Sequence, residues 1–296
     1  MFGEQDGSDP TEPPPLTPET VPTLGKVPAS QEERDERYFQ LLAQAVQACA
    51  TYKPMFGQGR KGGLTVEQFQ ELYQADSFYS WIGLDSPLMY AAHKAAGGMT
   101  SIYRQIGIGA QWIFSYVLQD TLGLSKAQAI WTYEVPTPSG KPRSLSLDGR
   151  IELEHVEHVH ARTRISEWMK EAADKLMLDS QIWSATRGVV FETRQGYKSK
   201  DSKRQNADIA NASSAYINHY IPVLMLFSAQ IDGGVALRYT QSRWLLLTGK
   251  IAGDSTTSTY AFCRDVLDYD LAGFFERNAA RIKSEVEAVL TALLSP

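Results

Sequence analysis

The chain has 296 residues, of which 43% are hydrophobic, so it can bury a sizeable core in one large domain or two small ones. A formal charge of −5 excludes binding of a polyanion through overall positive charge, so any such site must be a local patch. Cys49 and Cys263 lie too far apart for a metal-ligand motif, and neither a signal peptide nor a membrane span is evident. We therefore expect a cytoplasmic protein.

Residues 1 to 29 contain seven prolines, scattered acids and no hydrophobic periodicity. Such a composition predicts a flexible leader, because little apolar surface is available to offset the entropy of ordering it. From Ser30, a suitable helix N-cap, apolar residues recur at helical spacing. We expect a single domain over residues 30–296, with a helical lead-in at 30–125, a core at 126–232 and a C-terminal part at 233–296.

The lead-in predicts helices at residues 66–73, 87–96 and 100–122. In the last of these, Gly107 and Gly109 would allow another backbone to approach closely. These glycines lack the preceding strand and the third glycine of a dinucleotide-binding loop, so we interpret them as packing residues.

A hairpin with a Pro-Ser-Gly turn is predicted at residues 131–153. Leu145 and Leu147 alternate with polar neighbours, so Asp148 is expected to point away from the face that carries the two leucines. A helix at 154–178 precedes a buried strand through Val189 to Phe191, which leads into Glu192 and Arg194. A helix at 205–219, strands at 223–229 and 244–247, and a helix at 284–294 complete the chain. This order predicts an α/β fold, with a mixed central sheet flanked by helices.

Asp148 and Glu192 are the acids that such a sheet most plausibly brings together, since each alternates with apolar neighbours. Burying two carboxylates costs several kcal/mol unless a positive charge compensates them. Magnesium is the natural candidate, because it binds one or two carboxylates together with water and phosphate oxygens.

The order LDG at a hairpin end and ETR on the following strand resembles the acid, then acid-x-lysine, signature of the PD-(D/E)XK nuclease superfamily. The segment from Trp131 to Asp232 is similar to the core of a type II restriction endonuclease. The resemblance implies that Asp148 and Glu192 hold a divalent metal and that Arg194 takes the place of the catalytic lysine.

Two departures from this pattern leave alternatives open. Arginine does not lose its proton near neutral pH, so Arg194 cannot be a general base, and Lys198 is its rival for the lysine position. The long segment between the two acids makes Asp179 the fallback for the first acid. Gln111, on the helix at 100–122, is placed where some members of the family have a glutamate that reaches the metal.

A basic run follows the strand: Lys198, Lys200, Lys203 and Arg204, and then Gln205 and Asn206. Cations seek phosphates and amides can read adenine edges, so this run suits a loop that faces DNA. A solvated surface loop is the commoner fate of a charge run, and it remains the alternative.

Two other segments contain candidate binding residues. Three histidines lie at positions 155, 158 and 160, but their helical geometry is poor for zinc, which favours a solvated helix. The segment 232–244 offers Arg238, Tyr239 and Trp244, either for a DNA groove or as core aromatic residues beside outward-pointing arginines.

These features predict a magnesium-dependent type II restriction endonuclease that cleaves both strands of duplex DNA at a short sequence. A palindromic target would favour a homodimer, because two-fold symmetry presents the same surface to both half-sites. The alternatives are another PD-(D/E)XK nuclease, with a repair or structure-specific role, and a non-catalytic DNA-binding module.

Overall fold

The computed structural model describes residues 16–25, 27–54, 63–135, 143–197 and 202–294. In these residues the chain forms two compact units: a helical unit of residues 39–109 and 278–294, and a sheet unit of residues 16–38 and 110–277. The division does not follow the predicted boundaries at 125 and 232. None of the described helices is both long enough and apolar enough to cross a membrane.

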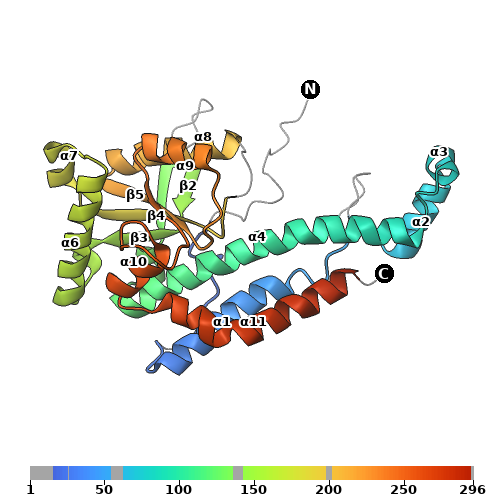
Figure 1. Cartoon of the computed structure of the whole chain (residues 1–296), viewed down its shortest axis with the longest axis horizontal. Helices are drawn as coiled ribbons and strands as arrows, with labels where there is room; N and C mark the ends of the chain where they lie inside the picture. The colour runs from blue at the N-terminus through green and yellow to red at the C-terminus, as the bar shows by residue number, and fades with distance from the viewer. Residues whose placement is uncertain (1–15, 26, 55–62, 136–142, 198–201, 295–296) are drawn as a thin grey trace. The chain divides into compact units, whose positions relative to one another are not determined.

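The helical unit contains α2 (Val66–Gln74), α3 (Ser77–Trp81) and parts of three longer helices, α1 (Gln31–Gln47), α4 (Pro87–Leu122) and α11 (Leu271–Leu294). Glycines on α4 allow its neighbours to approach closely (Figure 1). A Cβ atom on Gly98 would come within 2.8 Å of Leu293 on α11, and one on Gly109 within 2.8 Å of Leu42 on α1. The prediction that Gly109 serves close packing is therefore confirmed.

The sheet unit is built on a four-stranded sheet in the order β3-β4-β5-β6, in which β3 is antiparallel to β4 and the other pairs are parallel. A separate antiparallel pair, β1-β2, forms the predicted hairpin. The strands are β1 Trp131–Val135, β2 Arg143–Leu147, β3 Gly149–Glu152, β4 Gly188–Arg194, β5 Tyr220–Leu226 and β6 Leu245–Leu247. A mixed sheet with flanking helices confirms the predicted α/β fold.

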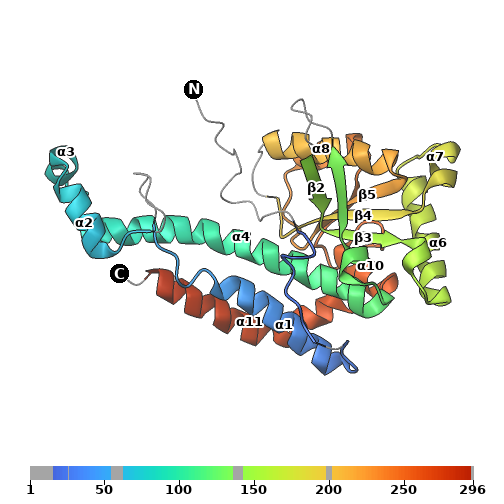
Figure 2. The same cartoon turned by 180° about the vertical axis from the view of Figure 1, so that it is seen from behind.

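Helices cover both faces of this sheet (Figure 2). On one face, Val190 and Leu224 pack with Ala212 of α8, Val235 of α9 and other apolar side chains. On the other face, the ring of Phe191 contacts Phe114 of α4 and Phe262 of α10. The remaining helices of the unit are α5 Lys126–Ala129, η1 Leu153–His155, α6 Val159–Lys175, α7 Ser180–Ala185, α8 Ser202–Ile217, α9 Gly233–Gln241 and α10 Thr259–Asp265.

The prediction of a flexible leader is wrong for residues 16–25, while residues 1–15 lie outside the described part. Leu16 and Val21 are 2% and 1% exposed. The hydroxyl of Tyr116 on α4 accepts from the Leu24 N–H at 2.9 Å and donates to the Pro22 carbonyl at 2.6 Å. Two buried apolar anchors and these backbone hydrogen bonds therefore dock the segment, although it has no helical or strand periodicity.

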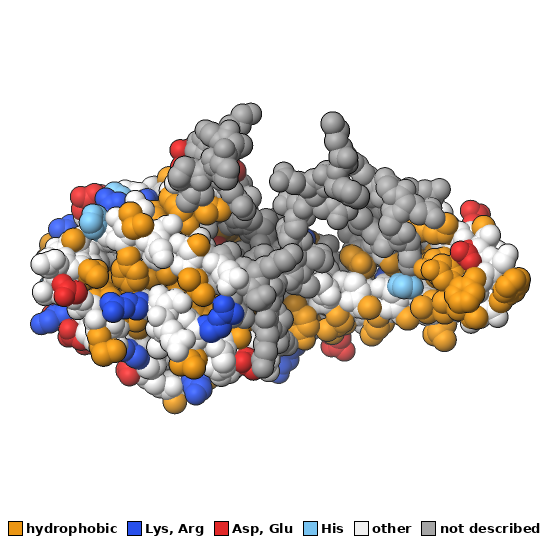
Figure 3. All heavy atoms as spheres, turned by 90° about the horizontal axis from the view of Figure 1, so that it is seen from above, with side chains coloured by type: hydrophobic (Ala, Val, Ile, Leu, Met, Phe, Trp, Pro, Cys, Tyr) orange, Lys and Arg blue, Asp and Glu red, His pale blue; other side chains and the backbone are white. Residues whose placement is uncertain are grey.

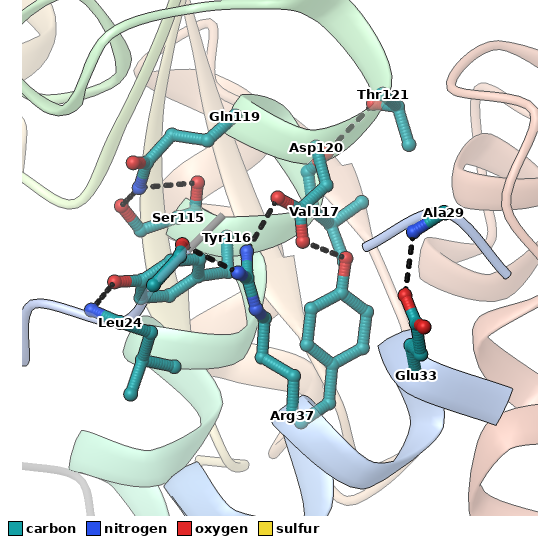
Figure 4. Close-up of polar contacts among 12 residues, drawn as sticks. Leu24, Ala29, Glu33, Arg37, Ser115, Tyr116, Val117, Gln119, Asp120 and Thr121 are labelled. Carbon is teal, nitrogen blue, oxygen red and sulfur yellow. Dashed lines mark hydrogen bonds and ion pairs between the residues drawn. The ribbon is translucent and has the colours of Figure 1, made fainter. Parts of the chain in front are cut away.

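Arg37 of α1 strengthens this docking within the sheet unit (Figure 4). Its guanidinium donates to Asp120 at 2.8 Å and to the carbonyl of Gly25 at 2.8 Å. The Tyr38 hydroxyl also donates to Asp120, at 3.0 Å. A cavity of about 250 Å³ lies beside these groups. Arg37 and Asp120, which line it, already form an ion pair with each other.

Several elements differ from the predictions. Among them, the closing helix begins at Leu271 and not at 284, and the strand expected at 223–229 is β5 (Tyr220–Leu226). The helices expected at 87–96 and 100–122 form one continuous helix, α4, because the glycines between them pack closely and do not break it. The helix expected at 154–178 begins only at Val159, after the 3₁₀ turn η1. The prediction also missed α7, which Asp179 caps.

Candidate active site

Strand pairing brings the two predicted acids together. Gly149 of β3 pairs with Phe191 of β4, and Asp148 lies in the bend directly before Gly149. The backbone N–H of Thr193 donates to Oδ2 of Asp148 at 2.7 Å, which ties the two chain segments at this point. The charge of Arg194 acts on Asp148 and Arg194 pairs with Glu192, so both carboxylates lie around the end of β4.

Gly149, the glycine of the LDG sequence, is required by close packing. A Cβ atom at this position would come within 2.6 Å of the ring of Phe114 and within 3.2 Å of the Cβ atom of Phe191. Only glycine fits without displacing one of these rings, and its small size lets α4 and β4 approach the chain directly after Asp148.

Arg194 is held between two carboxylates. Its Nη2 lies 2.9 Å from Oε1 of Glu192 and 3.0 Å from both carboxylate oxygens of Asp208 on α8. All three side chains are buried. Burial alone would lower the pKa of Arg194, but the charges of Asp208 and Glu192 hold that pKa well above its ordinary value. Arg194 is therefore a permanent cation, which agrees with the exclusion of a general-base role.

Two aromatic side chains donate hydrogen bonds to Asp208. The Tyr239 hydroxyl donates to Oδ2 of Asp208, and the Trp244 indole N–H donates to the backbone carbonyl of Asp208 at 3.2 Å. The hydroxyl groups of Tyr239 and Tyr197 are 2.9 Å apart. Tyr239 and Trp244 are each 1% exposed, so they are core aromatic residues and not a groove-binding pair.

Among the described residues, the site contains one guanidinium, that of Arg194, and three buried carboxylates: Asp148, Glu192 and Asp208. Burial raises the pKa of Asp148 to about 6, and the nearby charge of Asp208 acts in the same direction. The Thr193 N–H, the charge of Arg194 and the side chain of Gln111 oppose this rise. The arrangement is rich in negative charge and favours a proton or a cation.

Gln111 lies beside Asp148, as the sequence suggested. Its side chain is 3% exposed, and its Oε1 atom has no hydrogen-bond partner among the described residues. The hydroxyl of Thr193 is likewise buried and has no such partner in this part of the chain. A buried oxygen without a donor costs about 1–3 kcal/mol, so the Gln111 oxygen beside Asp148 is an atom whose bonding is incomplete.

The predicted basic loop is largely a helix. Lys198 and Lys200 lie outside the described residues. Lys203, Arg204, Gln205 and Asn206 fall in the first turns of α8, which begins at Ser202, so the expectation of a loop is wrong there. The side chain of Asn206 is exposed and accepts from Nη2 of Arg238 at 3.0 Å. Ala212 and Ala215 on α8 pack into the core, which explains why the helix extends past the charged run.

Asp179, the fallback acid, is not near the other site residues in the described contacts. It is exposed and caps α7, where its Oδ1 accepts from the backbone N–H of Gln181 at 2.8 Å. A capping role accounts for the residue, because helix N-termini prefer aspartate at this position. Asp179 therefore lies apart from the acids around Arg194 in the described contacts.

Glu152, Glu154 and His155 form a second acidic cluster, with possible ligand atoms within 4.8 Å of one another. Glu152 already has other partners, since it accepts from the Tyr220 hydroxyl at 2.8 Å and pairs with Arg187 at 3.1 Å. The cluster is explained by these contacts and does not require a metal. His158 and His160 are exposed, in agreement with the solvated helix preferred from the sequence.

Sequence reasoning missed Asp208 and its support from Tyr239. Asp208 follows the charged run and looks like one more surface charge in the sequence. Its helical spacing to Ala212 and Ala215, two buried residues of the same helix, was the available signal for its burial.

Comparisons with protein-family models, with curated proteins and with solved structures found no match for the chain.

Proposed function

We propose that the chain is a magnesium-dependent endonuclease that cleaves both strands of duplex DNA at a short sequence, in the manner of a type II restriction endonuclease of the PD-(D/E)XK superfamily. One observation carries the proposal: the buried acids Asp148 and Glu192 come together at the end of β4, where the Thr193 N–H donates to Asp148 and Arg194 pairs with Glu192 from the same strand face. An acid pair with a neighbouring cation at the end of a hairpin is the arrangement that this chemistry requires.

The residues present fit a divalent cation. All the candidate ligands are oxygen atoms, and the buried Oε1 of Gln111 has no hydrogen-bond partner in the described region. Hard cations such as Mg²⁺ prefer oxygen ligands. Asp148 and Glu192 would hold the ion, which would supply Lewis-acid stabilisation of the phosphate and lower the pKa of a bound water.

Arg194 has a defined task in this reaction. Because it stays protonated, it can stabilise negative charge that develops on the scissile phosphate, but it cannot accept a proton from water. Asp208 and Glu192 hold its guanidinium in one orientation. Lys198 remains the proposed alternative for the lysine role of the family.

DNA is the proposed partner, and the basic run provides its contacts. Lys198, Lys200, Lys203 and Arg204 would bind backbone phosphates, while Gln205 and Asn206 would contact base edges. Chain order supports this, because the run follows β4, the strand that ends with the acid and the arginine. A homodimer is proposed for a palindromic target.

A non-catalytic DNA-binding module is the second candidate, and one observation favours it. Arg194 is paired with Glu192 and Asp208, so this buried ion-pair network also has a purely structural explanation. A buried pair of this kind is weak evidence for either stability or catalysis.

Incubation of the purified protein with long phage DNA and Mg²⁺ tests the proposal. Discrete fragments are expected from a restriction endonuclease, and Ca²⁺ in place of Mg²⁺ should allow binding without cleavage. Random degradation would indicate another nuclease of the superfamily, with a repair or structure-specific role. Binding without cleavage in Mg²⁺ would identify the non-catalytic module.

A further inference from the structure

The α2–α3 end of the helical unit displays an apolar patch on its surface. Five large side chains form it: Trp81 is 81% exposed, Leu88 80%, Phe78 61%, Ile82 54% and Tyr79 39%. Figure 3 shows hydrophobic side chains gathered over this end of the unit. Isolated exposed apolar residues are ordinary, but five within eleven consecutive positions form a patch that needs an explanation.

The patch stands on an ordered scaffold. Phe69 is fully buried beneath it and packs with Leu64 and Tyr90. A capping box between Thr65 and Gln68 begins α2, and the carboxylate of Asp76 accepts from two backbone N–H groups of α3. This end of the unit therefore has a buried core of its own, and the five apolar side chains are exposed on its surface.

The charge of the sequence around the patch is mainly negative, which disfavours polyanionic partners. The sequence from residue 64 to residue 92 contains four acids and no lysine or arginine. Phosphate backbones and anionic lipid surfaces would be repelled by such a segment. An uncharged apolar surface, such as that of another protein molecule, is the partner chemistry that the patch favours.

We propose that this patch is a self-association surface, on which a second copy of the chain docks its own patch across a two-fold axis. The area supports this partner: the five side chains expose on the order of 600 Å² of apolar surface, given that a large aromatic residue buries 150–250 Å². Two facing patches would bury on the order of 1,200 Å², the lower end of the range for specific interfaces.

The acids do not oppose this pairing strongly. Asp76 is engaged at the N-terminus of α3, and the Asp85 carboxylate accepts from the Ser80 hydroxyl at 3.4 Å. Glu67 and Glu71 are exposed on α2, where a polar rim around an apolar centre is the usual anatomy of an interface. The proposal uses this surface alone and would stand even if the chain were not a nuclease.

Sedimentation of the full chain over a range of concentrations tests the proposal. The unmodified protein should be a dimer at micromolar concentration, and the double variant Trp81→Glu/Leu88→Glu should associate at least about 100-fold more weakly, because it buries charge at two anchor positions. Ile251→Glu is the matched control, since Ile251 is 63% exposed at another place in the sequence. That control should remain dimeric.

Circular dichroism checks that the double variant is folded, and a second measurement does not disturb the patch. Cys49 and Cys263 are buried, so a Ser77→Cys variant has one accessible thiol, on α3. A bismaleimide should join two such copies but should not join copies of a Ser180→Cys control, whose thiol is on α7. A monomeric unmodified protein would overturn the proposal and leave a different protein as the occupant. Dimers of the double variant, or equal cross-linking of the two thiol variants, would also overturn it.

Discussion

Replacing Asp148 with asparagine should make the metal-free protein more stable. The carboxylate of Asp148 is buried beside Asp208, and burial raises its pKa to about 6. Asparagine has nearly the same shape and keeps an oxygen that can accept from the Thr193 N–H. It carries no charge, so the substitution removes the cost of ionising a buried group.

The size of this gain depends on pH. A pKa that rises from 3.8 in the unfolded chain to about 6 in the folded protein means that the folded state binds its proton more tightly. The wild type therefore loses stability as the pH rises from 3.8 to 6, and the full loss is about 3 kcal/mol above that window. The variant escapes this loss, so its advantage should be nearly absent near pH 4, about half developed near pH 5 and complete at about pH 8.

Urea denaturation in EDTA at about pH 5 and pH 8 measures the effect. The matched control is Asp179→Asn, because asparagine caps a helix as well as aspartate does and Asp179 is exposed. The control should change stability by less than about 0.5 kcal/mol at either pH. A variant of Asp148 that is no more stable than the wild type at the higher pH, or that gains equally at both, would refute the reasoning. Added Mg²⁺ should stabilise the wild type and not the variant.

Three further predictions concern other parts of the chain. Arg194→Ala should destabilise the fold by about 3–5 kcal/mol in urea denaturation, since it leaves buried carboxylates unpaired, whereas Arg264→Ala, which removes an exposed pair, should cost less than about 1 kcal/mol; equal effects would contradict the buried network. Leu16→Ala should lower the free energy of unfolding by about 2–5 kcal/mol, because Leu16 is buried. Val27→Ala, at an exposed position, should lower it by less than about 0.5 kcal/mol. A Leu16 variant as stable as the wild type would show that residues 16–25 are not docked. Lys203→Ala should weaken binding to all DNA sequences and reduce the salt dependence by about one unit in a fluorescence titration, and an unchanged slope would remove this lysine from the interface.

The sequence was informative where local patterns decide the structure. Alternation around Leu147 and Asp148 predicted the hairpin, and the apolar run at Val189 predicted β4. Once both were strands, their acids could be expected close together, and the structure brings Asp148 to the backbone of Thr193, next to Glu192. These results depend on a side-chain period of two, which is readable from a single chain.

The residues that the sequence did not reveal depend on tertiary contacts. Asp208 contacts Arg194 only because α8 packs on the sheet, and nothing in the local pattern separates its charge from those of the basic run. The docking of residues 16–25 likewise depends on tertiary contacts. It is held by Leu16, Val21 and the hydroxyl of Tyr116, a residue far along the chain.

We propose that Asp148 and Glu192 bind a divalent cation with which the protein cleaves DNA. The most direct measurement compares the initial rate of plasmid cleavage in Mg²⁺ for the wild type, Glu192→Gln and the control Asp179→Asn, with DNA binding in Ca²⁺ measured on the same preparations. We predict cleavage by the wild type and the control, and a loss of at least about 100-fold for Glu192→Gln with retained binding. Equal cleavage by all three proteins, or none by a folded wild type that binds DNA, would contradict the account.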